Sequence, residues 1–149
     1  MPNLTYFFEP KHLNLSKPRE EDLTGDPSID LLNLVRIIAK SLDNVSGYGW
    51  DLSTAENIAQ MYRGFLFLCK TYPDRVIVPP QEVDAFWHLH ILDTRNYTSD
   101  CQIIFGYYLH HFPYSGLIGC GLSAEQEHIY LEGTLDLVRK HFPHWLDSL

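Results

Sequence analysis

The stretch "VDAFWHLHILD", residues 83–93, places two histidines one residue apart beside a tryptophan in an otherwise apolar run. Positions i, i+3, i+4 and i+7 share one face of an α-helix. In this stretch those positions are Val83, Phe86, Trp87 and His90. A helix turns about 100° per residue, so His88 points nearly opposite to His90. The stretch therefore predicts a helix whose two histidines have different neighbours.

Helical periodicity and helix-start signals extend in both directions from this stretch. An Asp-Pro pair and two capping-box patterns are typical of helix N-termini, and they stand at Asp26–Pro27, Ser53–Glu56 and Ser123–Gln126. The predicted helices cover residues 27–42, 53–72, 80–92, 94–105 and 123–141. In the last helix, His128 lies on the apolar stripe, where a core histidine is expected. Residues 141–145 are expected to fray at the surface.

The fold class follows from these helices. The β-branched run Val76–Val78 is too short and isolated to found a sheet. About five helices joined by short turns predict an all-α fold, a compact bundle. A chain of 149 residues predicts a single domain over residues 1–149. Residues 1–25 lack periodicity and predict an extended N-terminal arm, whereas residues 26–149 form the helical body.

Composition excludes several classes of function. The net charge of −8, with no run of Lys or Arg, argues against a nucleic-acid partner. No apolar stretch approaches the length of a membrane span, so no membrane partner is expected. The N-terminus lacks a signal-peptide pattern. Cys69, Cys101 and Cys120 include no CxxC pair, which favours free thiols in a cytoplasmic protein.

Two short segments carry candidate metal ligands. Asp84 and His88 are four residues apart on the predicted helix, close enough to bind one ion together. "YYLHHFPY" adds His110 and His111; adjacent side chains diverge, so one of the two is expected to point inward. Two histidines and one carboxylate suit Fe(II) with open positions, and they also suit catalytic Zn²⁺. A divalent transition metal, Fe or Zn, is the cofactor this pattern favours.

Four residues are expected around this cluster: Trp87, His90, Tyr97 and Cys101. Trp87 is interpreted as core packing. The Tyr97 hydroxyl is aimed at the cluster or, alternatively, bonded to a backbone group in the core. A buried His90 bonded to Asp93 or Tyr97 is favoured over a ligand role. Cys101 faces the core by periodicity, where a thiol stays protonated, so a nucleophile is not expected.

The longer segment "VDAFWHLHILDTRNYTSDCQIIFGYYLHH", residues 83–111, resembles the glycine-rich domain-containing protein-like family. The family pattern is V-D-x-x-W-H-x-H, then a Tyr and a Cys four residues apart, then a Gly and a His. It is matched here by Val83, Asp84, Trp87, His88, His90, Tyr97, Cys101, Gly106 and His110 or His111. The resemblance covers about residues 60–115 and is to short, single-domain bacterial members, because a glycine-rich tail is lacking. It implies a functional cluster but no particular reaction.

Competing functions remain open at this point. In the first, the chain is a small helical metal-binding protein, or further a metalloenzyme whose open metal position activates water or dioxygen. In the second, it is a non-catalytic interaction module. Its Asp/His/Trp cluster is then a structural polar network, and the N-terminal arm or "FPYSGLIG" (residues 112–119) docks a protein partner. Metal-free acid–base catalysis by Asp84 and His88 ranks below both. The expected partner is a small molecule or a protein; the sequence determines neither the oligomeric state nor whether the chain is an enzyme.

Overall fold

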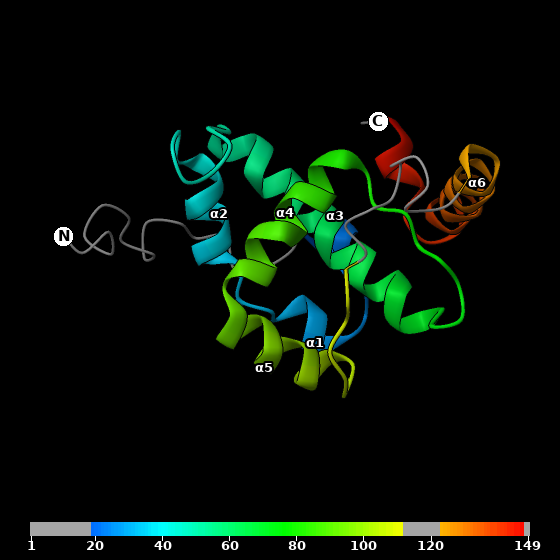
Figure 1. Cartoon of the computed structure of the whole chain (residues 1–149), viewed down its shortest axis with the longest axis horizontal. Coiled ribbons are helices and arrows are strands. Elements are labelled where there is room, and N and C mark those ends of the chain that lie inside the picture. Colours follow the sequence, from blue (N-terminus) through cyan, green and yellow to red (C-terminus); the bar gives the residue numbers. More distant parts are fainter. Residues whose placement is uncertain (1–18, 112–122, 148–149) are drawn as a thin grey trace, which may run out of the picture.

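The computed structural model describes residues 19–111 and 123–147 of the chain. All regular structure in these ranges is helical, which confirms the predicted all-α fold (Figure 1). The α-helices are α1 (Pro27–Asp30), α2 (Val35–Leu42), α3 (Leu52–Thr71), α4 (Gln81–Leu92), α5 (Thr94–Ile104) and α6 (Ala124–His141). Two 3₁₀ turns, η3 (Glu20–Asp22) and η4 (Pro143–Asp147), flank them. Of the predicted N-terminal arm, residues 1–18 lie outside the described residues.

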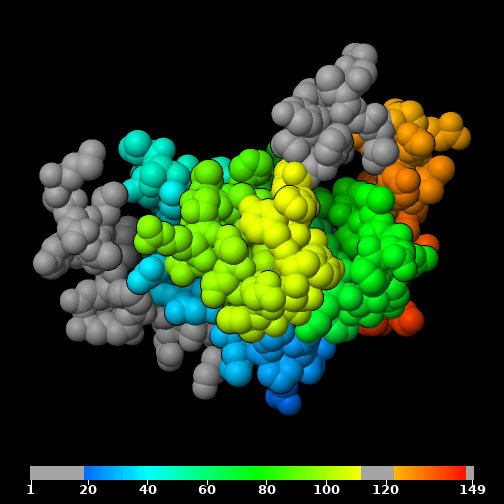
Figure 2. Space-filling view, turned by 60° about the horizontal axis from the view of Figure 1, so that its bottom comes forward, coloured from blue at the N-terminus to red at the C-terminus, as the bar shows by residue number. Residues whose placement is uncertain are grey.

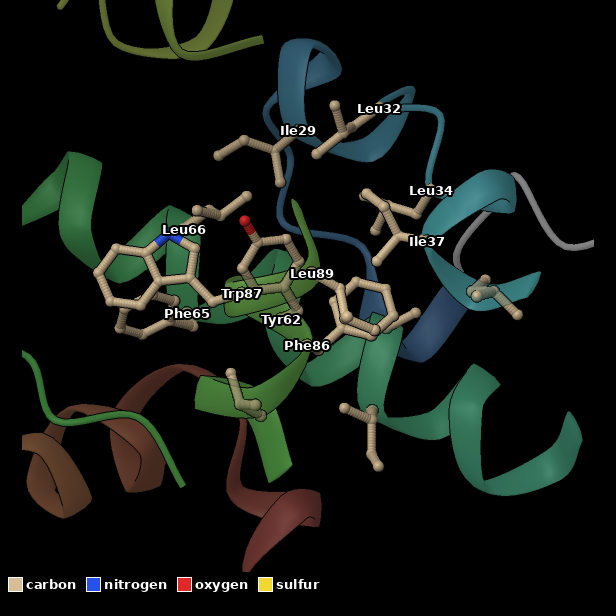
Figure 3. Close-up of a cluster of buried hydrophobic side chains, with 14 of the residues drawn as sticks. Ile29, Leu32, Leu34, Ile37, Tyr62, Phe65, Leu66, Phe86, Trp87 and Leu89 are labelled. Atoms are coloured by element: carbon tan, nitrogen blue, oxygen red, sulfur yellow. The ribbon is translucent and has the colours of Figure 1, made fainter. Parts of the chain in front are cut away.

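The longest helix of the described part, α3, packs against α4 and α2 and holds the centre of the core (Figure 3). Its N-cap is Asp51, whose carboxylate accepts a hydrogen bond from the Thr54 N–H at 2.7 Å. The predicted capping box at Ser53 and Glu56 is therefore wrong. An Asp caps as well as a Ser does, and here it starts the helix earlier, at Leu52.

The single helix predicted over residues 27–42 is wrong, because it is two helices broken at residues 31–34. The fully buried Arg63 of α3 donates to the carbonyl oxygens of Ile29 at 2.7 Å and Asp30 at 3.3 Å. Both carbonyl oxygens therefore have a hydrogen-bond donor even though the helix does not continue past Asp30. After the break Leu34 is buried in the core, whereas Leu31 is 69% exposed.

The third and fourth predicted helices are confirmed as α4 and α5, with ends that agree within one residue. Gly106 follows α5 with a φ of +78°, a left-handed conformation that favours glycine. It reverses the chain, and residues 107–111 return without regular structure toward α4. Figure 2 shows this segment (yellow) on the surface beside the light-green residues of α4 and α5.

The last helix begins at the predicted capping box, in which Ser123 and Gln126 exchange side-chain and backbone hydrogen bonds. Its C-terminal half joins a second apolar cluster, formed by Leu68, Leu137, Val138, Phe142 and Trp145. His128, expected in the core, is exposed instead, because the buried residues of α6 lie beyond it, from Thr134 onward.

The expected fraying of residues 141–145 is also wrong. Trp145 is buried, and its indole lies against Gly64 of α3, where no side chain stands in the way. The indole Nε1 donates to the Asp22 carboxylate at 3.0 Å, and His144 bonds the same oxygen at 2.9 Å. These bonds tie the C-terminal turn to η3. None of the helices in the described ranges is long and apolar enough to cross a membrane.

Candidate metal centre

Three of the predicted ligands come together in the fold. One ligand atom each from Asp84, His88 and His111 lie within 4.8 Å of one another. The Nε2 of His111 is 2.6 Å from the Asp84 Oδ1, and the His88 and His111 rings are 5.0 Å apart between centroids. Asp84 and His88 lie one turn apart on α4, as the sequence predicts. The cluster opens to solvent, because His88 is exposed and the Asp84 side chain is 42% exposed.

The structure decides between the two adjacent histidines. The side chain of His111 is only 12% exposed, and its ring packs edge-on against Trp87 with centroids 4.4 Å apart. His110 is exposed, and its ring contacts Tyr108 instead, at 4.7 Å. The expectation that one of the pair points inward is met by His111.

Trp87 and Tyr97 lie on the buried side of the Asp84/His88/His111 cluster. Trp87 is buried as predicted, and its indole lies between the rings of Phe65 and His111. Its Nε1 donates to the Tyr97 hydroxyl at 2.9 Å, and that hydroxyl donates to the Leu109 carbonyl. The second of the two predictions for Tyr97 is therefore confirmed: it is a core residue whose hydroxyl bonds a backbone carbonyl. Burial raises the pKa of the Tyr97 phenol, which keeps the proton on this donor.

His90 lies on the other side of α4, 1% exposed. Its Nδ1 is 2.6 Å from the Tyr62 hydroxyl, and its Nε2 is 2.8 Å from the Asp100 Oδ2. Since a carboxylate only accepts, Nε2 carries a proton and donates to Asp100, while Nδ1 bonds the Tyr62 hydroxyl. The predicted partners, Asp93 and Tyr97, are wrong: the Tyr97 ring only packs edge-on against His90. Both ring nitrogens of His90 thus have hydrogen-bond partners inside the fold, which indicates a structural role for this residue.

Cys101 is buried, as its periodicity predicts. Burial raises the pKa of its thiol. The thiol is thus protonated near neutral pH and unsuited to nucleophilic attack.

Sequence reasoning missed three residues that surround these groups. Tyr62 and Asp100 complete the bonds of His90. Tyr48 donates from its hydroxyl to the Ala85 carbonyl at 2.9 Å, and burial together with the negative charge of Asp84 raises its pKa. Tyr48 is 37 positions from Ala85, and Tyr62 is 28 positions from His90. No local pattern joins residues so far apart, so no sequence signal could have found Tyr48 and Tyr62. Asp100 is 10 positions from His90, on the next helix, and its meeting with His90 depends on how α4 and α5 pack.

Comparison with known proteins places the chain in a family. A family model described as UCP032817-like matches residues 29–128, more than half of the 149 residues, and this range contains Asp84, His88 and His111. No curated protein and no solved structure matches the chain. The resemblance to the glycine-rich domain-containing protein-like family is therefore wrong, because the family model that matches the chain is a different one. The chain belongs to the UCP032817-like family.

Proposed function

We propose that this chain is a small helical metal-binding protein that holds one divalent transition metal on Asp84, His88 and His111. The proposal rests on one observation: the candidate ligand atoms of these three residues all lie within 4.8 Å of one another. Ligand bonds to Zn²⁺ are about 2.0–2.2 Å long, so donors on one ion stand about 3–3.5 Å apart. Small side-chain rotations close that difference, and the exposure of His88 leaves it room to rotate.

The donor set favours Fe or Zn. Two imidazoles and a carboxylate form the set typical of non-haem Fe(II) sites, and the same set with a water is typical of catalytic Zn²⁺. Mg²⁺ and Ca²⁺ prefer oxygen ligands throughout. Three protein ligands leave at least one position for water, dioxygen or a small-molecule substrate. The solvent-facing side of the cluster gives such a ligand access, which supports a metalloenzyme as the further proposal.

One observation favours the interaction module as the second candidate. Asp84 and His111 already bond each other at 2.6 Å, and His111 packs on Trp87, so the cluster holds together as a polar network. In that case the bond joins α4 to residues 107–111, and the exposed face of the cluster contacts a protein partner. A metal would displace this bond, because the same carboxylate and imidazole atoms become its ligands.

The test is metal content per chain in protein purified without an affinity tag, followed by calorimetric titration of the apoprotein with Zn²⁺. Asp84→Asn, His88→Ala and His111→Ala should each lose binding. His110→Ala is the matched control, because it removes an exposed histidine next in the chain but outside the cluster. Full occupancy in both Asp84→Asn and His88→Ala would remove the metal site and leave the interaction module as the better account.

A further inference from the structure

His111 differs from the other two proposed ligands in what supports it. Asp84 and His88 are fixed by the backbone of α4, whereas His111 follows the left-handed Gly106 on a segment without regular structure. No ladder of helical hydrogen bonds sets its place. Because a metal ligand must be held within roughly 0.5 Å, the position of His111 has to come from tertiary contacts.

Those contacts converge on Leu109, two residues before His111. The Leu109 carbonyl accepts a hydrogen bond from the Tyr97 hydroxyl. Tyr97 belongs to α5 and is only 1% exposed. α5 therefore binds the backbone of the segment that carries His111.

The same hydroxyl reaches the helix that carries the other ligands. Tyr97 accepts from the Trp87 Nε1 at 2.9 Å, and Trp87 immediately precedes His88 in α4. The Trp87 ring also supports the His111 ring from behind, with centroids 4.4 Å apart. The Tyr97 phenol oxygen thus bonds both α4, at Trp87, and the segment before His111, at Leu109.

We propose that Tyr97 acts as a clamp on the Leu109 backbone that positions His111 for metal binding. It is a positioning residue and does not touch the ion. This inference rests on the proposed metal site. Loss of the Tyr97 hydroxyl leaves the Leu109 carbonyl without its donor and the Trp87 Nε1 without its acceptor. Changes at outer partners of metal ligands typically weaken metal affinity by about 10–100-fold.

The experiment compares Tyr97→Phe with Tyr62→Phe. Both substitutions delete one hydroxyl from a fully buried tyrosine that bonds within the core, at 1% and 0% exposure. The Tyr62 hydroxyl bonds His90 and has no hydrogen bond to residues 107–111. Zn²⁺ affinity is measured by titration calorimetry and the stability of the apoprotein by thermal unfolding. We expect both variants to lose stability and Tyr97→Phe alone to weaken the Zn²⁺ Kd, by about tenfold or more.

Cys101 lies one turn from Tyr97 on α5, in the core cluster against which Leu109 packs. Cys101→Ala loosens that packing and carries the test if Tyr97→Phe does not fold; it should weaken the Zn²⁺ Kd in the same direction. Wild-type affinity in both variants, with tight binding by the wild-type protein, overturns the clamp alone. Equal weakening in Tyr62→Phe also overturns it, because the effect would then be general loosening of the core. A wild-type protein that binds no Zn²⁺ removes the metal site together with the clamp.

Discussion

His88 and His90 stand two residues apart in α4 and occupy opposite sides of the helix. His88 is exposed and lies beside the His111 ring, whereas His90 is 1% exposed and bonds Tyr62 and Asp100. The prediction that the two histidines have different neighbours is confirmed. It also gives the two residues separable roles, one in the proposed metal site and one in the core.

His88→Ala and His90→Ala should therefore fail in different assays. His88→Ala is expected to lose metal and leave the unfolding of the apoprotein nearly unchanged, because the side chain is exposed. His90→Ala leaves Tyr62 and Asp100 without their partner, which should cost about 1–3 kcal/mol of stability while metal is retained. Metal content and urea unfolding of the two apoproteins check this. Metal loss in His90→Ala at temperatures where it stays folded contradicts the separation.

Asp84→Asn should abolish the stabilisation that metal gives. The amide keeps the shape of the side chain and its capacity to hydrogen bond His111, but it lacks the anionic charge that favours a divalent ion. A bound ion raises the melting temperature by linkage. Addition of a chelator should then lower the Tm of the wild-type protein and leave the Tm of Asp84→Asn unchanged. An equal chelator effect on both proteins would place the ion elsewhere.

Gly64→Ala should displace the C-terminal turn. A Cβ at Gly64 would stand 1.8 Å from the Cη2 of Trp145, so the indole must leave its place. Overpacking of this kind costs about 1–3 kcal/mol, and the Trp fluorescence should shift to the red. Gly133→Ala in α6 is the matched control, since in the described part of the chain no atom beyond its own helical turn lies within 4 Å of the added Cβ; there alanine should stabilise the helix by up to about 1 kcal/mol. Identical effects at the two positions would contradict the packing argument.

Stability should fall as the solution is acidified. Burial raises the pKa of Asp22, but hydrogen bonds from Trp145, His144 and Arg19 outweigh it and lower the pKa below its ordinary 3.8. That contribution is present above about pH 4 and is lost as the pH falls through the folded-state pKa. Burial, with the charge of Lys140, lowers the pKa of His141 below 6.5, so stability is also lost as the pH falls below that value.

Both shifts have the same sign, because in each case the unfolded chain binds more protons than the folded one. Urea unfolding between pH 7 and about pH 3 measures the slope. Asp22→Asn should flatten the acidic part of the curve, and His141→Gln should flatten the part near pH 6. A wild-type free energy of unfolding that is constant over this range would show that neither group is held as the structure indicates.

Much of the architecture could be predicted from the sequence because it rests on local interactions. The spacing of Val83, Phe86, Trp87 and His90 sets the buried face of α4, and the Ser123–Gln126 capping box starts α6 where expected. Asp84 and His88 could be paired for the same reason, since residues four apart on a helix are neighbours. Such features depend on backbone geometry within a few residues, whatever the rest of the chain does.

The tertiary structure decided what depends on residues far apart in the chain. Arg63 breaks the first predicted helix through bonds to carbonyls 33 and 34 positions away, and Trp145 reaches Asp22 across 123 positions. His111 was selected over His110 by its contacts with Trp87 and with Asp84, 27 positions away. Periodicity tells which face of a helix is buried but not which side chain meets it there. The partner is determined by how the helices pack, because packing fixes the distances and directions that hydrogen bonds and metal ligands require.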